Sequence, residues 1–188
     1  MTWTSRDRVL AAINHEEADR VPIDLGGTGA STIVIDAYDR LKTFLGLEHE
    51  TAIRSKLNHL AEPDPMIMNR LGVDTRAINA GGYDGAVGWV DDLTFIDHFG
   101  VTFKGTTGTD DKPFLYKDGP LCVGKLTIDR IDAMEWPDPD NPGIVRGIKE
   151  KVAGYKAEGD YCLVLNVPDQ VIHRAYAVRG MVDFLKDF

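Results

Sequence analysis

The sequence has little cysteine, no long apolar run and no secretory leader pattern. Its two cysteines, Cys122 and Cys162, lie far apart, which argues against a disulfide framework or a paired-cysteine zinc motif and favours a reducing compartment. No apolar segment reaches the roughly 20 residues that cross a bilayer, and the N-terminus lacks the apolar core of a signal peptide. We therefore expect a cytoplasmic protein that has no membrane partner.

Positive charge is also scarce. Lysine and arginine together number 21 against 30 aspartates and glutamates, so the net charge is −9, and no basic run occurs. Because neutralisation of phosphates dominates affinity for nucleic acids, DNA and RNA are not expected partners. The 43% hydrophobic and 27% charged residues are typical of a globular chain that can bury a core.

A glycine-rich segment, "DRVPIDLGGTGAST" at residues 19–32, has the order of an anion-binding loop: apolar residues, glycines, then hydroxyl residues. It does not match a dinucleotide fingerprint, because Thr32 stands where the third glycine belongs, and it lacks the P-loop lysine. The segment remains a candidate for binding a substrate through its small residues, which are Gly26, Gly27 and Thr28.

Apolar spacing predicts the elements of the N-terminal third. We expect Ser5 to cap a helix whose apolar face carries Val9, Leu10 and Ile13, and we expect "VPIDL" at 21–25 to be a strand.

Three- and four-residue spacing predicts further helices. The strongest signal runs from Val34 to Leu45 and ends at Gly46. The segment 53–72 is expected to hold a helical piece, a proline-marked turn and a second helix from Pro65.

The rest of the chain alternates strands and helices. The segment "VDTRAIN" at 73–79 is a candidate buried strand, and the continuous apolar run "YCLVLNVP" predicts a second buried strand at 161–168. Short apolar runs among glycines predict hairpins between Gly81 and Lys125. Helices are expected near Thr127, from 144 to 155 and from 171 to the last residue. This order indicates an α/β architecture with parallel strands, which is completed by a partner or by a longer chain.

Several landmarks occur in a characteristic order: "SRDRVLAAINHEEADRVPIDLGG", "HFGVTFK", "MEWPDPDNPG", "YCLVLNV" and "AYAVRGMVDFLKDF". Together they resemble the uroporphyrinogen decarboxylase superfamily, which includes zinc-dependent methylcobalamin methyltransferases. The resemblance implies a (β/α)8 TIM barrel, a fold of about 250 residues, of which this chain would supply the N-terminal half. The implied parts of this incomplete domain are a lead-in at 1–62, the first helix and strand of the barrel at 63–80, a hairpin insertion at 81–126, and a helix, strand and helix at 127–188.

Two departures favour one branch of that superfamily. The decarboxylases carry arginines just after the first proline-containing strand and an aspartate at the end of the first barrel strand. Here these places read "DLGGTGAST" and "AINAGG", without arginine or a carboxylate in register. The resemblance then implies methyl transfer between a corrinoid and an acceptor, with zinc activating a thiol. The family's metal ligands lie in the C-terminal half, so we assign none here and expect this chain alone to be catalytically incomplete.

Two alternatives stay open. A true porphyrinogen decarboxylase would need Arg174 or Arg179 to supply positive charge. A non-catalytic scaffold module would be completed by a second copy, as a homodimer, or by the missing half of the barrel. Under the enzymatic hypotheses the partner is a small-molecule substrate or a corrinoid protein.

Four further residues are candidates for contact with a substrate. Asn79 and Asn166 lie at the ends of the predicted strands, Tyr83 follows the first strand, and His173 follows the second. A simpler role for the asparagines and the histidine is bonding to nearby backbone.

Other chemically capable side chains receive structural roles. His59 and His98 lie among charged residues and are expected to be solvated, whereas Cys162 is expected to be a core residue. The aspartates of "WPDPDNPG" are expected to form a rigid turn.

Overall fold

The computed structural model describes residues 2–105, 115–166 and 171–187. The chain divides into two compact units: the first comprises Met1–Gly81 and Val145–Val167, and the second comprises Gly82–Ile144 and Pro168–Phe188. Helices are mixed with small sheets, and the described residues form no closed barrel. The predicted barrel therefore stays a prediction.

In the first unit, helix α1 (Ser5–Ile13) has a different cap and a different buried face from those predicted. The side-chain oxygen of Thr4, not that of Ser5, accepts the capping hydrogen bond at 3.1 Å. Ala11 is the buried residue of the helix, whereas Ile13 is 66% exposed. The predicted apolar face is thus wrong, because the helix is buried at the small side chain of Ala11.

The segment 21–25 is not a strand, contrary to the prediction. It contacts the rest of the unit through Ile23 and Asp24. The N–H of Ile23 donates to Asp74 Oδ2 at 2.8 Å and its carbonyl accepts from the Asp74 N–H at 2.8 Å, and Asp24 Oδ1 accepts from the Thr75 hydroxyl at 2.5 Å. Pro22 has no N–H, and the N–H of Ile23 donates to the side chain of Asp74. Because neither residue can donate to the backbone of a neighbouring strand, regular strand pairing does not form here.

Helix α2 (Ile35–Leu45) confirms the strongest helical prediction. It ends at Gly46, whose φ of 72° lies in the left-handed region that glycine adopts without cost. Tyr38 is buried with Ala61 and Ile67 in the core of the first unit. Its hydroxyl accepts a hydrogen bond from the N–H of Asp64 at 2.7 Å.

The helical piece expected after residue 53 is wrong. Strands β1 (Ile53–Ser55) and β2 (Leu60–Ala61) pair there in an antiparallel sheet. The turn between them includes His59 with φ of 54°, a left-handed conformation that reverses the chain and ends any helix. The helix expected from Pro65 is confirmed as α3 (Pro65–Arg70).

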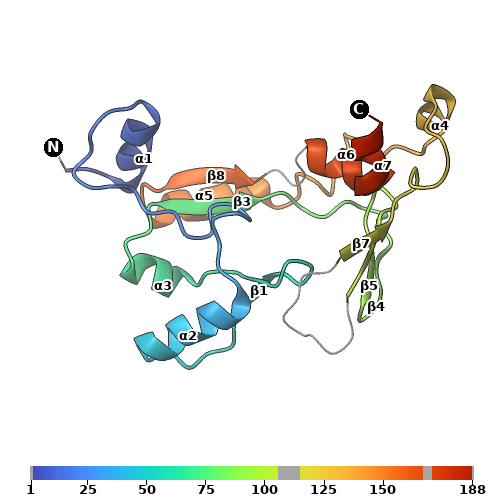
Figure 1. Ribbon diagram of the computed structural model, residues 1–188. Coiled ribbons are helices and arrows are strands. Elements are labelled where there is room, and N and C mark those ends of the chain that lie inside the picture. Colours follow the sequence, from blue (N-terminus) through green and yellow to red (C-terminus); the bar gives the residue numbers. More distant parts are fainter. Residues whose placement is uncertain (1, 106–114, 167–170, 188) are drawn as a thin grey trace. The chain divides into compact units, whose positions relative to one another are not determined.

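The two predicted strands form a parallel pair, as expected. The first is buried, but the second is only half-buried and its Leu165 is 57% exposed, so the prediction that the second strand is buried is wrong. Strand β3 (Thr75–Asn79) pairs with β8 (Cys162–Asn166) in register along the whole length of both strands. Figure 1 shows the two side by side with helix α5 (Ile148–Glu158) alongside; α5 packs against β3, and α1 packs against both strands. Helix α5 starts later than the spacing predicted, because Gly147 before it adopts φ of 76°.

The second unit contains the predicted hairpins. Strands β4 (Gly88–Asp91), β5 (Thr94–Ile96), β6 (Thr102–Lys104) and β7 (Leu115–Asp118) form one antiparallel sheet in sequence order. Each joins the next in the sequence, as a meander built from local turns does.

The helices of the second unit are short. Helix α4 (Ile128–Asp132) starts at its predicted cap, Thr127. The single C-terminal helix that we predicted is instead two helices, α6 (Val171–Arg179) and α7 (Met181–Lys186). Gly180 breaks it with φ of 84°. The unit's buried core is formed by Val101, Leu121, Ala177 and Val178.

The described helices are far shorter than a membrane span. The longest, α2 and α5, have 11 residues each, against roughly 20 needed for a bilayer. Within residues 2–105, 115–166 and 171–187, no helix is long and apolar enough to cross a membrane.

Candidate functional site

A group of polar side chains gathers in the first unit where β3 and β8 end. Its members, which we call the carboxyl-end cluster, are Arg54, Glu62, Asn79 and Asn166. The carboxyl ends of parallel strands are where α/β proteins place their ligands, because loops from different strands meet at that edge. The cluster is therefore the candidate site of this unit.

The two asparagines predicted as strand-end candidates lie together. Asn79 and Asn166 are register partners at the last position of the β3–β8 pair. The Nδ2 group of Asn166 donates to Oδ1 of Asn79 at 3.2 Å. Their proximity follows from the parallel register, which the spacing in sequence could not supply.

Arg54 is a member of the cluster that sequence reasoning missed. It projects from β1 with a side chain only 7% exposed, and it donates to the carbonyl of Gly26 at 2.5 Å and to Oδ1 of Asn79 at 2.7 Å. Residues 24–32 of the glycine-rich segment contain no arginine, but strand β1, which we predicted to be helical, brings Arg54 to them. Arg54 could have been found from the sequence only if residues 53–55 had been predicted as a strand.

The glycine-rich segment is closed on itself. The N–H of Gly26 donates to the carbonyl of Ser31 at 3.0 Å, that of Gly27 to Asp24 Oδ1 at 2.9 Å, and that of Thr28 to Ser31 Oγ at 2.9 Å. An anion-binding loop needs outward-facing N–H groups. These three are already satisfied internally, so they do not form a phosphate cradle.

Close packing explains why glycines occupy the segment. A Cβ on Gly26 would lie 2.8 Å from Cγ of Pro63, and its φ is +86°. A Cβ on Gly27 would lie 2.4 Å from Oδ1 of Asp24. That same carboxylate oxygen accepts a hydrogen bond from the Thr75 hydroxyl at 2.5 Å, which ties the segment to the first residue of β3.

The carboxyl-end cluster has no net positive charge. Arg54 contributes one positive charge, and Nε of Arg54 lies 3.8 Å from a carboxylate oxygen of Glu62. Because the single guanidinium is offset by this carboxylate and already donates to two neutral acceptors, the cluster offers little attraction to a ligand with several carboxylates.

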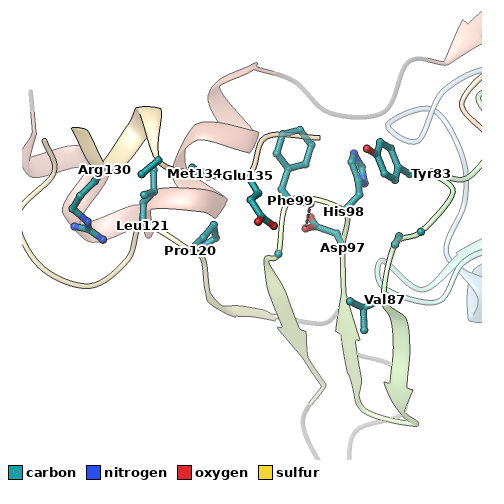
Figure 2. A pocket seen from close by; sticks show the side chains of 14 residues that line it. Tyr83, Val87, Asp97, His98, Phe99, Pro120, Leu121, Arg130, Met134 and Glu135 are labelled. Atoms are coloured by element: carbon teal, nitrogen blue, oxygen red, sulfur yellow. Dashed lines mark hydrogen bonds between the residues drawn. The ribbon is translucent and has the colours of Figure 1, made fainter. Parts of the chain in front are cut away.

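In the second unit, the candidate Tyr83 lines a cavity of about 570 Å³, which we call the Tyr83 pocket (Figure 2). Its ring stacks on His98, with centroids 4.8 Å apart and planes 10° from parallel. His98 is half-buried, so the expectation that it is simply solvated is wrong. Stacking against Tyr83 removes one face of the imidazole from water.

His173 and His59 lie outside that pocket. His173, on α6, is exposed, and its ring centroid lies 4.8 Å from that of Tyr176. His59 is also not simply solvated, as we expected, because its side chain is 19% exposed and its Nε2 lies 3.6 Å from Asp36 Oδ1.

The two arginines considered as carboxylate-binding residues are engaged within the second unit. Arg174 forms an ion pair with Asp97, and its guanidinium lies over the ring of Phe99. Arg179 is buried and donates to Asp187 Oδ2 at 2.7 Å and to the carbonyl of Leu121 at 2.9 Å. These contacts give both arginines structural roles.

Two further groups were predicted to have structural roles. Cys162 is half-buried and is therefore not the core residue that we expected, and its partial burial raises the pKa of the thiol. Asp138 accepts a hydrogen bond from the N–H of Asp140 at 2.9 Å, as in a rigid turn. Among the residues that the structure describes, no three histidine, cysteine, aspartate or glutamate side chains gather as metal ligands.

Comparison with known proteins adds no relative. No family model, no curated protein and no solved structure matches the chain. The likeness to the uroporphyrinogen decarboxylase superfamily therefore rests on the sequence landmarks.

Proposed function

We propose that the chain forms part of a uroporphyrinogen decarboxylase-like TIM-barrel methyltransferase, which moves a methyl group between a corrinoid and an acceptor. In this proposal the carboxyl-end cluster contacts the substrate. The observation that supports it is the parallel, in-register pair β3–β8, which ends in the bonded amides of Asn79 and Asn166. A pair of this kind is the repeating unit of the barrel, and its carboxyl end is the catalytic face.

The charge of the cluster supports methyl transfer over decarboxylation. A porphyrinogen carries several carboxylates, each of which is best held by a fork of guanidinium donors. The one arginine of the cluster, Arg54, already donates to Gly26 and Asn79. Neutral amides and carbonyls suit instead the amide groups on the edge of a corrinoid.

In the proposed transfer, the cobalt–carbon bond breaks and the methyl group passes to the nucleophilic atom of the acceptor. The electron pair of the broken bond stays on the cobalt, and the acceptor loses its proton to solvent. Zinc would supply the activation of a thiol acceptor, but the described residues offer no three-ligand group that fits it. The role of this chain is to bind and orient the methyl donor.

The test is binding and turnover of methylcobalamin. The 188-residue chain and the complete product of its gene are each titrated with methylcobalamin by calorimetry. Each is then incubated with methylcobalamin, a thiol and zinc, and the loss of methylcobalamin is followed by absorbance. We expect the gene product to bind methylcobalamin and to methylate the thiol, and the 188-residue chain alone to give no methylation. Asn166→Ala should weaken binding about tenfold, the equivalent of one hydrogen bond of about 1.4 kcal/mol.

Matched controls separate the proposal from its rivals. Asn14→Ala replaces an exposed asparagine at the end of α1 and should leave binding unchanged. Conversion of uroporphyrinogen to coproporphyrinogen by the gene product would replace methyl transfer with decarboxylation. Absence of both activities and of methylcobalamin binding would overturn the enzymatic proposal in favour of a scaffold role.

A further inference from the structure

The Tyr83 pocket lies entirely within the second unit and is independent of the carboxyl-end cluster. Its volume of about 570 Å³ is within the range of about 300–1,000 Å³ that is usual for small-molecule sites. Four segments line it: the loop before β4, the turn between β5 and β6, the start of the segment after β7, and the end of α4. Figure 2 shows the side chains that line the pocket, with Tyr83, His98 and Phe99 next to one another.

One wall of the pocket is aromatic. Tyr83 stacks on His98, and the His98 ring lies 4.6 Å from that of Phe99. The hydroxyl of Tyr83 accepts a hydrogen bond from the N–H of Asp138 at 2.7 Å, which fixes the tyrosine ring. Leu121 and Met134 add apolar surface. Rings held in this way offer faces and edges on which a flat ligand can stack.

The backbone behind the aromatic wall is held by Asp97. This carboxylate is 7% exposed, and its Oδ1 accepts hydrogen bonds from the N–H groups of Phe99 and Val101, each at 2.9 Å. Its second oxygen pairs with Arg174. The wall is therefore formed before a ligand arrives, which lowers the entropic cost of binding.

The charges at the pocket balance. Its lining includes the carboxylates of Asp97 and Glu135 and the guanidinium of Arg130. Arg174 pairs with Asp97 from outside the lining. Two positive groups thus offset two negative groups, and the pocket has no excess charge that would select an anion or a cation.

We propose that the Tyr83 pocket binds a neutral, planar aromatic or heteroaromatic molecule, stacked against Tyr83, His98 and Phe99. The flat rings account for the shape of the ligand, and the balanced charges account for its neutrality.

The test compares the binding of three small molecules to the 188-residue chain. 2-Naphthamide is neutral and planar, its decahydro analogue has the same amide without the aromatic rings, and 2-naphthoate carries a negative charge. Binding of each is measured by calorimetry. We expect 2-naphthamide to bind about 2- to 12-fold more tightly than the saturated amide, which corresponds to the 0.5–1.5 kcal/mol of an aromatic pair, and more tightly than the naphthoate.

A variant that fills the cavity locates the site. Ala133 is exposed and lines the pocket at the end of α4, so Ala133→Trp should reduce 2-naphthamide affinity by at least about tenfold. Ala157 is an exposed alanine of α5 in the first unit, and Ala157→Trp should leave the affinity within about twofold. Circular dichroism checks that both variants fold.

Three results would each overturn the proposal. These are no binding of 2-naphthamide at millimolar concentration, equal affinity for the saturated amide, and unchanged affinity in a folded Ala133→Trp variant. The comparison of aromatic with saturated probe uses the unmodified chain, so it decides the matter even if a variant does not fold. Failure of methylcobalamin binding would leave the pocket untouched, because the two sites share no residue.

Discussion

Asp74 is the residue on which polar contacts of the first unit converge. Its carboxylate is fully buried and accepts hydrogen bonds from Arg20 Nη1 at 2.6 Å and from the Ile23 N–H at 2.8 Å. Arg8 lies 3.4 Å away. Burial alone would raise the pKa of this carboxyl, but the bonds from Arg20 and Ile23 outweigh it and hold the pKa below its ordinary value of 3.8.

The depressed pKa of Asp74 predicts a loss of stability in acid. In the unfolded chain the carboxyl titrates near 3.8, so the stabilisation is complete above that pH and is lost as the pH falls toward the lower folded pKa. At pH 7 Asp74→Asn should lower the free energy of unfolding by about 1.5–3 kcal/mol, because it removes the buried charged acceptor of the hydrogen bonds from Arg20 and Ile23. Urea titrations should show this difference shrinking below about pH 4.

Glu17→Gln is the matched control for that measurement. It neutralises an exposed carboxylate of the same unit and should change the free energy of unfolding by less than about 0.5 kcal/mol at either pH. A constant gap between wild type and Asp74→Asn from pH 7 to pH 3 would show that the carboxylate is not the group that titrates.

At the scale of elements, the glycine-rich segment predicts unequal effects of the same substitution. Gly26→Ala should lower the free energy of unfolding by about 1–3 kcal/mol, because φ is positive and Pro63 occupies the space of the new Cβ. Gly29 has nothing within 4 Å of its position for a Cβ, so Gly29→Ala should be neutral or stabilising by up to about 1 kcal/mol. Thermal melts of both variants measure this, and equal melting temperatures would refute the packing argument.

Element prediction from sequence succeeded where the signal was local. The helix that ends at Gly46 and the helix that starts at Pro65 carry their own boundary residues, and both are confirmed. It failed where contact with another segment, near or far in the sequence, decides the conformation. Strand β1 exists because β2 pairs with it, and the break at Gly180 packs close to Cys122, whose Sγ would lie 3.2 Å from a Cβ there.

At the scale of the whole molecule, the two units have separate buried cores. A Cβ on Gly119 would lie 2.3 Å from the carbonyl oxygens of Ala177 and Val178, so Gly119→Ala should disrupt the second core. Hydrogen exchange should show a larger loss of protection at Val101 and Leu121 than along β3. Gly154→Ala, in open space on α5, should cause no such loss, and equal loss in both units would contradict separate cores.

The sequence by itself determined the locally encoded features: the acidic balance of charge, the two strands that pair, the hairpin region and the helices that carry their own caps. Only the tertiary structure decided which side chains share a site. The parallel register places Asn166 beside Asn79. The pairing of β1 places Arg54 against the glycine-rich segment, and packing of the second unit stacks His98 on Tyr83. Periodicity reports how each segment meets a core, whereas a site depends on contacts between segments far apart in the chain, which local patterns do not encode.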